Sequence, residues 1–263
     1  MPFTLAHAAA AWPFRRTRLI LSAVVMGSFA PDFEYFLRLA PGGEFGHTIL
    51  GAFVLDVPLS LVVLWLFYAW MREPMIVLLP EPIQRRIPRG PCSFPFWGPR
   101  RLALLAASVL VGVATHLLWD SFTHPAFWPW HPWTLLTERV RLPMVGSVPY
   151  YKLFQQGSTV AGMAVLLVWL AYWYRTTPEQ RAVAPAFPAP KWGLVALLAF
   201  LTVAASLVRA WIGVGIPNSP RLLEIFMEYA VITAIALTWL QWLLWGILWS
   251  RRQKFRSAWP HGE

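Results

Sequence analysis

The stretch RLALLAASVLVGVATHLLWDSFTH, residues 101–124, is apolar over most of its length and then carries His116, Asp120 and His124 at intervals of four residues. About 20 consecutive apolar residues are enough for an α-helix to cross the hydrocarbon core of a bilayer. The stretch therefore predicts a transmembrane helix with three ionisable side chains toward one end. Each such side chain costs a few kcal/mol inside a membrane unless a partner satisfies it. The three side chains together therefore predict a functional site within the membrane.

The whole chain has the composition of an integral membrane protein. Of its 263 residues, 57% are hydrophobic and 13% are charged, and the mean hydropathy is +0.51; soluble domains carry about 25% charged residues. The net charge of +10 does not indicate nucleic-acid binding, because the basic residues flank long apolar runs instead of forming one patch with exposed aromatic residues. The single cysteine, Cys92, excludes an intrachain disulfide and any multi-cysteine metal site.

Six apolar segments are candidate membrane spans, so we expect an all-α, polytopic transmembrane helix bundle. The first candidate span should be short or broken, because Pro31, Asp32 and Glu34 interrupt it. We expect a membrane domain that holds the site, followed by two further spans and a basic cytoplasmic tail. The spans are residues 18–39, 47–71, 101–124, 157–175, 192–213 and 225–249, and the two domains are residues 1–175 and 176–263.

The lysine and arginine residues predict the orientation of this bundle. Cytoplasmic loops are enriched in both residue types, and sixteen of the 22 would lie on one side of a six-span arrangement. We therefore expect a multi-pass protein of the cytoplasmic (inner) membrane with both termini in the cytoplasm. The polar residues of interest would then share one depth near the outer face, although they played no part in setting the orientation. These residues are Asp32, Glu34, His47, His116, Asp120 and His124.

Helix geometry separates the three polar residues of the third span. Residues four apart on an α-helix differ by about 40° in direction and about 6 Å in height, so His116 and Asp120 share a face and are close enough to bind one metal ion. Imidazole nitrogen and carboxylate oxygen suit a divalent ion, zinc foremost, with manganese or iron as alternatives. His124 lies about 12 Å from His116 along the axis. It would bind a second ion, contact the substrate or support a ligand.

Further ligands precede the second span. Pro31 favours a turn in which the carboxylates of Asp32 and Glu34 could converge on one ion, and His47 follows a glycine-rich loop that lets it face inward. Asp56 should not share the site, because it lies nine residues beyond His47, about 13 Å deeper and half a turn away.

Five short motifs resemble a bacterial membrane-protein family, domain of unknown function 4184. The resemblance covers about the first 175 residues. More distantly, the order of PD, His and HxxxD is similar to membrane-bound metal-dependent hydrolases. The motifs are PFTLAHAAA (2–10), GSFAPDFEYFLRL (27–39), FGHTILG (45–51), THLLWDSFTH (115–124) and YYKLFQQGST (150–159).

The resemblance implies a metal-dependent hydrolase with five metal ligands. Glu34 stands where the hydrolase relatives usually carry a second Asp, which leaves the choice of metal open. His7 can reach the site only if residues 3–13 form a half-helix that runs away from the site and turns at Arg15–Arg18. The five are His7, Asp32, His47, His116 and Asp120.

The most specific function that we expect is hydrolysis of an ester or phosphoester bond near the outer leaflet. The substrate would be a membrane lipid or a lipid-linked molecule, with water activated by the ion, Glu34 or Asp32 as base and His124 as a second catalytic residue. Two alternatives remain open. One is a transporter that handles metal ions or protons with the same side chains, and the other is a non-catalytic membrane scaffold.

Overall fold

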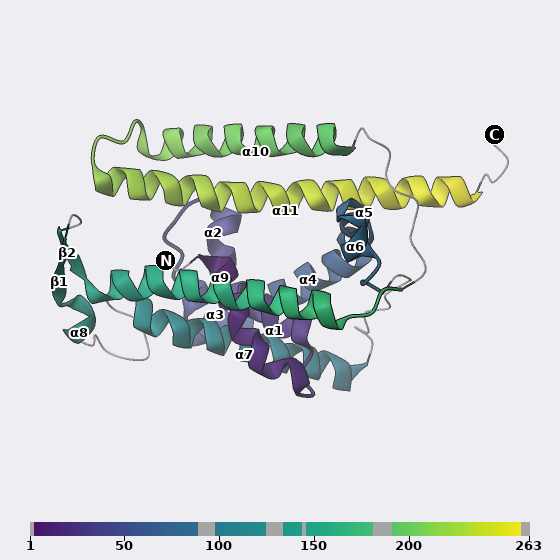
Figure 1. The fold of residues 1–263 in the computed structure, drawn as a ribbon, viewed down its shortest axis with the longest axis horizontal. Coiled ribbons are helices and arrows are strands. Elements are labelled where there is room, and N and C mark those ends of the chain that lie inside the picture. The colour runs from purple at the N-terminus through teal and green to yellow at the C-terminus, as the bar shows by residue number, and fades with distance from the viewer. Residues whose placement is uncertain (1–2, 89–97, 125–133, 144–145, 181–190, 259–263) are drawn as a thin grey trace. The chain divides into compact units, whose positions relative to one another are not determined.

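The computed structural model describes residues 3–88, 98–124, 134–143, 146–180 and 191–258. Helices dominate this part of the chain, which confirms the all-α fold class (Figure 1). One antiparallel hairpin departs from the expectation, with β1 (Arg139–Leu142) paired to β2 (Gly146–Pro149). Gly146 has a φ of +88°, which a residue without Cβ adopts at no steric cost.

Five helical segments of the described chain are long and apolar enough to cross a membrane. They correspond to the last five expected spans, and they identify an integral membrane protein. The first is assembled from α3 (Ile49–Gly51), η4 (Ala52–Asp56), α4 (Val57–Leu66), η5 (Phe67–Met71) and α5 (Arg72–Leu78), in which η4 and η5 are π-helical. The others are α7 (Pro99–Thr123), α9 (Tyr150–Thr176), and parts of α10 (Lys191–Val214) and α11 (Pro220–Ala258). Two single-turn helices, α6 (Glu81–Gln84) and α8 (Thr134–Thr137), lie between spans.

Residues 18–39 do not form a continuous span. They fold into α1 (Leu21–Gly27), the 3-10 turn η2 (Ala30–Asp32) and α2 (Phe33–Arg38). Proline has no backbone N–H and disfavours the α conformation in the residue before it, so the break falls at Pro31, as expected.

The N-terminal residues form η1 (Thr4–Arg16), a 3-10 helix that runs alongside α9. Near its start, the backbone N–H of Phe3 donates to Thr159 Oγ1 at 3.1 Å. Near its end, the Trp12 ring lies 5.1 Å from that of Trp169, further along α9. Thr4 therefore lies at the level of the early part of α9, and Arg16 at the level of its later part.

The chain then returns along α7, so residues 4–32 form a helical hairpin. The backbone N–H of Ile20 donates to Ser108 Oγ at 3.0 Å, and Ser28 lies beside His116, two turns further along α7. The tip of the hairpin contains Arg15 and Arg16.

Two glycines let α1 and α7 pack with their backbones in contact. A Cβ at Gly27 would lie 2.1 Å from the Val109 carbonyl oxygen, and a Cβ at Gly112 would lie 2.1 Å from the Val24 carbonyl oxygen. Small residues allow this kind of close helix packing in membrane proteins. The contact is what brings the end of α1 against the middle of α7.

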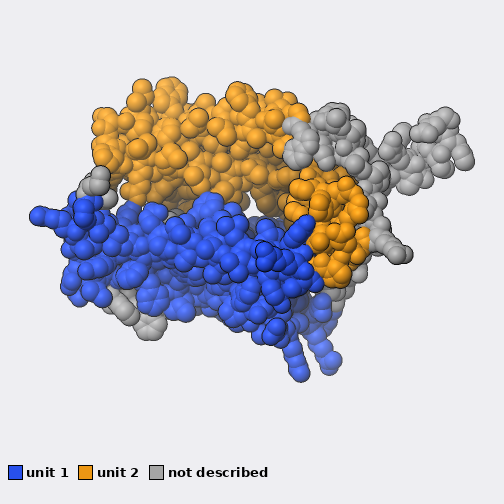
Figure 2. Space-filling model, in the orientation of Figure 1, with its two compact units in different colours: residues 1–34, 43–64, 95–176 blue, residues 35–42, 65–94, 177–263 orange. Residues whose placement is uncertain are grey.

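The chain divides into two compact units, coloured blue and orange in Figure 2. The first consists of residues 1–34, 43–64 and 95–176, and it holds all five expected metal ligands. Within the second unit, α10 and α11 lie side by side and antiparallel (Figure 1). The basic tail beyond Ala258 lies outside the described residues.

Candidate metal centre

The five expected ligands come from four separate elements, and all five are buried. His7 lies on η1, Asp32 on η2 and His47 on the 3-10 turn η3 (Phe45–His47). His116 and Asp120 lie on α7. Two overlapping groups of three have their ligand atoms within 4.8 Å of one another. The groups are His7, His116 and Asp120, and Asp32, His47 and His116.

His116 belongs to both groups, and a hydrogen bond from its Nδ1 atom fixes the orientation of its ring. Its Nδ1 lies 2.8 Å from the backbone carbonyl oxygen of Ser28. A carbonyl oxygen only accepts, so Nδ1 must donate and the neutral ring then has its lone pair on Nε2. Metal-binding histidines use the same arrangement, in which the second nitrogen donates to a carbonyl or carboxylate.

Around His116 Nε2, the donor atoms have the spacing of ligands around one ion. Nε2 lies 3.3 Å from Asp120 Oδ2 and 3.7 Å from Asp32 Oδ1. His47 Nε2 lies 3.8 Å from the same Asp32 oxygen and 3.9 Å from the same Asp120 oxygen. Ligands at about 2.0 to 2.2 Å in a tetrahedron are about 3.3 to 3.6 Å apart. Four of the six ligand-to-ligand distances in this set of four side chains are therefore close to those of a tetrahedral site, and slightly longer.

Three of these metal-binding atoms have no hydrogen-bond partner in the described part of the chain. No hydrogen-bond donor reaches His116 Nε2, Asp32 Oδ1 or Asp120 Oδ2, and all three atoms are buried. Carboxylates buried without a partner are strongly destabilising, and a metal ion or a proton must offset their charge. The donor set of nitrogen and carboxylate oxygen suits a divalent ion such as zinc. The residues present thus fit a metal ion.

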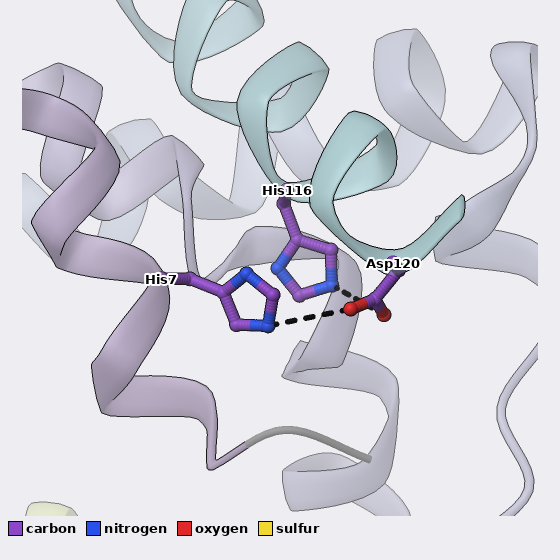
Figure 3. A group of neighbouring side chains, drawn as sticks. All are labelled: His7, His116 and Asp120. Carbon is purple, nitrogen blue, oxygen red and sulfur yellow. Dashed lines mark ion pairs between the residues drawn. The ribbon is translucent and has the colours of Figure 1, made fainter. Parts of the chain in front are cut away.

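His7 approaches the centre from η1 (Figure 3). Its Nε2 lies 3.4 Å from Asp120 Oδ1, and its ring stacks on the His116 ring with 4.0 Å between centroids. Because it faces the other oxygen of Asp120, His7 extends the four-residue set at one edge. The N-terminal segment descends from the site and turns near Arg15 and Arg16, which is the arrangement that a role for His7 requires.

Both carboxylates are also held by hydroxyl groups. Thr4 Oγ1 donates to Asp32 Oδ2 at 2.6 Å, and Thr123 Oγ1 lies 3.4 Å from Asp120 Oδ1. The bond from Thr4 leaves Asp32 Oδ1 facing His116 and His47. Sequence reasoning missed Thr4, although its position three residues before His7 places both on one face of a 3-10 helix, which has three residues per turn.

Asp32 and Glu34 do not converge as expected. Asp32 points into the cluster, whereas Glu34 Oε2 accepts a hydrogen bond from the backbone N–H of Phe45 at 3.0 Å and packs against Gly43. η2 continues directly into α2, so the backbone stays helical and side chains two positions apart point in different directions. Glu34 is in neither ligand group of the described residues, and it holds the loop that leads to His47.

His47 lies just before the first span, where Thr48 caps the helix by accepting from the Gly51 backbone N–H at 2.9 Å. Burial lowers the pKa of His47 to about 4, with a further lowering from His116. Its imidazole is therefore neutral near pH 7, and neutral imidazole is the form that binds metal ions.

His124 lies closer to the cluster than its place in the sequence indicates. α7 ends at Thr123, and His124 has extended backbone, so its ring folds back until Nδ1 is 3.2 Å from the Asp120 carbonyl oxygen and 3.8 Å from Asp120 Oδ2. The axial separation of about 12 Å from His116 assumed a continuing helix. At 21% exposure, the side chain of His124 is the most accessible of the group.

Asp56 lies outside both ligand groups of the described residues, as expected. It is nevertheless fully buried, and a Cβ at Gly46, the residue before His47, would lie 3.2 Å from Asp56 Oδ1. The loop that carries His47 folds over this carboxylate. This contact was not predicted from the sequence, because one continuous helix from His47 to Asp56 was assumed.

The fold and the buried cluster together define an integral membrane protein with a candidate metal centre. The chain belongs to the family described as Domain of unknown function (DUF4184), whose model matches residues 1–249. The match confirms the resemblance seen in the motifs and extends it beyond residue 175 into the last two spans. No curated protein and no solved structure matches the chain. The distant similarity to metal-dependent hydrolases stays a prediction.

Proposed function

We propose that the protein is a metal-dependent hydrolase that cleaves an ester or phosphoester bond of a membrane lipid or lipid-linked substrate. The observation that carries the proposal is the convergence of three buried atoms that have no hydrogen-bond partner among the described residues. Asp120 Oδ2 and Asp32 Oδ1 lie 3.3 Å and 3.7 Å from His116 Nε2. A metal ion or a proton must offset the charge of these buried carboxylates, and the geometry around His116 Nε2 favours the metal ion. A purely structural role would leave these atoms paired with donors.

Zinc is the ion that the donor set suits best, with manganese or iron as alternatives. When bound, a divalent ion polarises the scissile carbonyl or phosphoryl oxygen and makes water a stronger nucleophile. His116, Asp120, Asp32 and His47 would hold it. His7 would hold the second oxygen of Asp120 in place.

The outer end of α7 is where a substrate would reach this centre. His124 is partly exposed and its Nδ1 lies 3.8 Å from Asp120 Oδ2, so it is placed to contact a substrate or to accept a proton. Glu34 is the weaker candidate for a base, because its carboxylate already accepts from the Phe45 backbone. We assign it as a positioning residue for the His47 loop.

The site would face the outer side of the cytoplasmic membrane. Five arginines lie just before α7 or in its first turn, which favours a cytoplasmic location for the start of α7 and an outer location for its end. They are Arg85, Arg86, Arg89, Arg100 and Arg101. The pairing of η1 with α9 puts Phe3 and Thr4 at the level of the site, not of Arg16. We therefore propose an outer N-terminus in place of the cytoplasmic one expected from six spans, while the end of α11 stays cytoplasmic.

Metal analysis joined to an activity screen tests the proposal. The purified protein should carry metal and should hydrolyse at least one ester or phosphoester in a panel of membrane lipids, and the His116→Ala variant should lose both properties. Metal uptake into vesicles without turnover would favour the transporter, to which the buried Asp56 within a span would then contribute. Protein that binds no metal would favour the scaffold.

A further inference from the structure

A groove of about 650 Å³ lies between η1, α7 and α9, on the side of the metal centre where Trp119 and Thr123 are located. Its walls are mainly apolar, with Leu118, Phe122 and Phe154 among the lining residues. These three side chains are also well exposed on the surface of the described protein. Since α7 and α9 are long and apolar enough to cross a membrane, we infer that the groove faces the hydrocarbon of the bilayer.

Two of the three hydroxyl groups that line the groove already donate their hydrogen atoms to their own helices. Thr115 Oγ1 donates to the Gly112 carbonyl oxygen at 2.7 Å, and Ser158 Oγ donates to the Gln155 carbonyl oxygen at 3.2 Å. Both hydroxyls are satisfied by their own helices. A hydrocarbon chain is the ligand that gains from such a surface.

The groove borders the metal centre directly. Trp119 lines the groove and makes an edge contact with the His7 ring, 5.5 Å between centroids. Thr123 also lines the groove, and its hydroxyl lies 3.4 Å from Asp120 Oδ1. From Thr115 to Thr123 the groove follows α7 for about 12 Å, or two turns.

We propose that this groove holds an acyl chain of the lipid whose head group lies at the metal centre. The inference rests on the proposed hydrolase function and narrows its substrate to lipids with a long hydrocarbon chain. The chain would lie along α7 and α9, and the ester or phosphoester group would then be held beside His124 and Asp120. Short-chain or water-soluble esters would bind without this contact and react poorly.

A glycine in the groove allows a clean test. A Cβ at Gly157, which lines the groove, would meet no atom within 4 Å, so the Gly157→Leu side chain can begin there without a backbone clash and occupy part of the groove. Gly193 in α10 is the matched control, because a Cβ there also meets no atom within 4 Å. Ala161→Phe gives a second way to fill the groove.

The protein and its variants are placed in phospholipid vesicles that contain a phospholipid with a photoreactive acyl chain, and labelled peptides are identified by mass spectrometry. We expect labelling concentrated on residues 115–123 and 153–161, reduced at least fivefold by Gly157→Leu and by Ala161→Phe, and unchanged by Gly193→Leu. Metal content should be equal in all four proteins, which shows that the centre is intact.

Equal labelling of the groove and of the exposed face of α10, unaffected by Gly157→Leu, would overturn the inference. The labelling does not depend on turnover, so the two proposals fail separately. Selective groove labelling without hydrolysis of any lipid would sustain the groove and contradict the hydrolase. Hydrolysis that is equally fast for long and short chains in both glycine variants would sustain the hydrolase and contradict the groove.

Discussion

His116 and Ser28 are joined by a hydrogen bond of 2.8 Å between the imidazole Nδ1 and the backbone carbonyl oxygen. The bond links α7 to the end of α1, at the point where Gly27 and Gly112 bring the two backbones together. It fixes the tautomer that turns the Nε2 lone pair toward Asp32 and Asp120. Close helix packing and the chemistry of the centre therefore depend on the same contact.

The packing of these glycines should control metal binding. Gly112→Ala places a Cβ about 2.1 Å from the Val24 carbonyl oxygen, so α1 must move away from α7. We expect a lower thermal unfolding temperature and a clear loss of bound metal. Gly193→Ala, where the new Cβ meets nothing within 4 Å, should change neither property. Equal behaviour of the two variants in a melting and metal-content assay would show that the close approach is not needed.

The hydroxyl of Thr4 should strengthen metal binding through Asp32. Thr4→Val removes the 2.6 Å bond that orients this carboxylate, and loss of such a supporting partner costs about 10- to 100-fold in metal affinity. Thr176→Val is the control, because the Thr176 hydroxyl donates to its own helix at Tyr172. Competition with a chelator measures the metal affinity of the two variants. Unchanged affinity in Thr4→Val would show that Thr4 does not support the metal centre.

Glu34 should prove to be a positioning residue and not a base. Glu34→Gln keeps an oxygen that can accept from the Phe45 backbone N–H, so turnover should stay within about twofold of the original. Glu34→Ala should weaken metal binding, because the loop to His47 loses this contact. Removal of a general base costs about 10²- to 10⁴-fold; a loss of that size in Glu34→Gln, with metal retained, would restore the catalytic role expected from the sequence.

His124 should affect turnover more than metal retention. Its ring contacts Asp120 from the exposed side, outside the four-residue set around His116 Nε2. We expect His124→Ala to keep its metal and lose most activity, whereas His116→Ala and Asp120→Ala lose the metal. Equal retention in all three variants would contradict the ligand assignment, and loss in all three would make His124 a ligand.

The hairpin of residues 4–32 makes a prediction about topology. With Cys92 replaced by Ser, a cysteine introduced at Thr17 should react with a reagent only from the cytoplasm, and one at Gly42 only from outside, because the chain returns along α7 to the level of the site. A cysteine at Phe3 should share the outer location. Labelling of Phe3→Cys from the cytoplasm would support the original expectation of a cytoplasmic N-terminus.

Five of the six expected spans and the shared face of His116 and Asp120 could be predicted from the sequence, because both depend on strong local patterns. Apolar length defines α7, and four-residue spacing puts His116 and Asp120 on one face of it. The break at Pro31 was visible too. These features require no knowledge of which helix packs against which.

The directions of individual side chains could not be predicted in the same way. Asp32 and Glu34 separate because residues 30–38 are helical, so side chains two positions apart diverge. His124 folds back because α7 ends at the residue before it. Thr4 reaches Asp32 only through a tertiary contact between residues 28 positions apart. Such contacts depend on the pairing of helices, which one sequence does not specify.

The most direct test is an anomalous difference map at the zinc absorption edge, from crystals of the purified protein grown with zinc. We expect one strong peak at about 2.0 to 2.2 Å from His116 Nε2, Asp120 Oδ2, Asp32 Oδ1 and His47 Nε2. A map with no peak among these atoms, or with zinc bound only elsewhere on the protein, would contradict the metal centre.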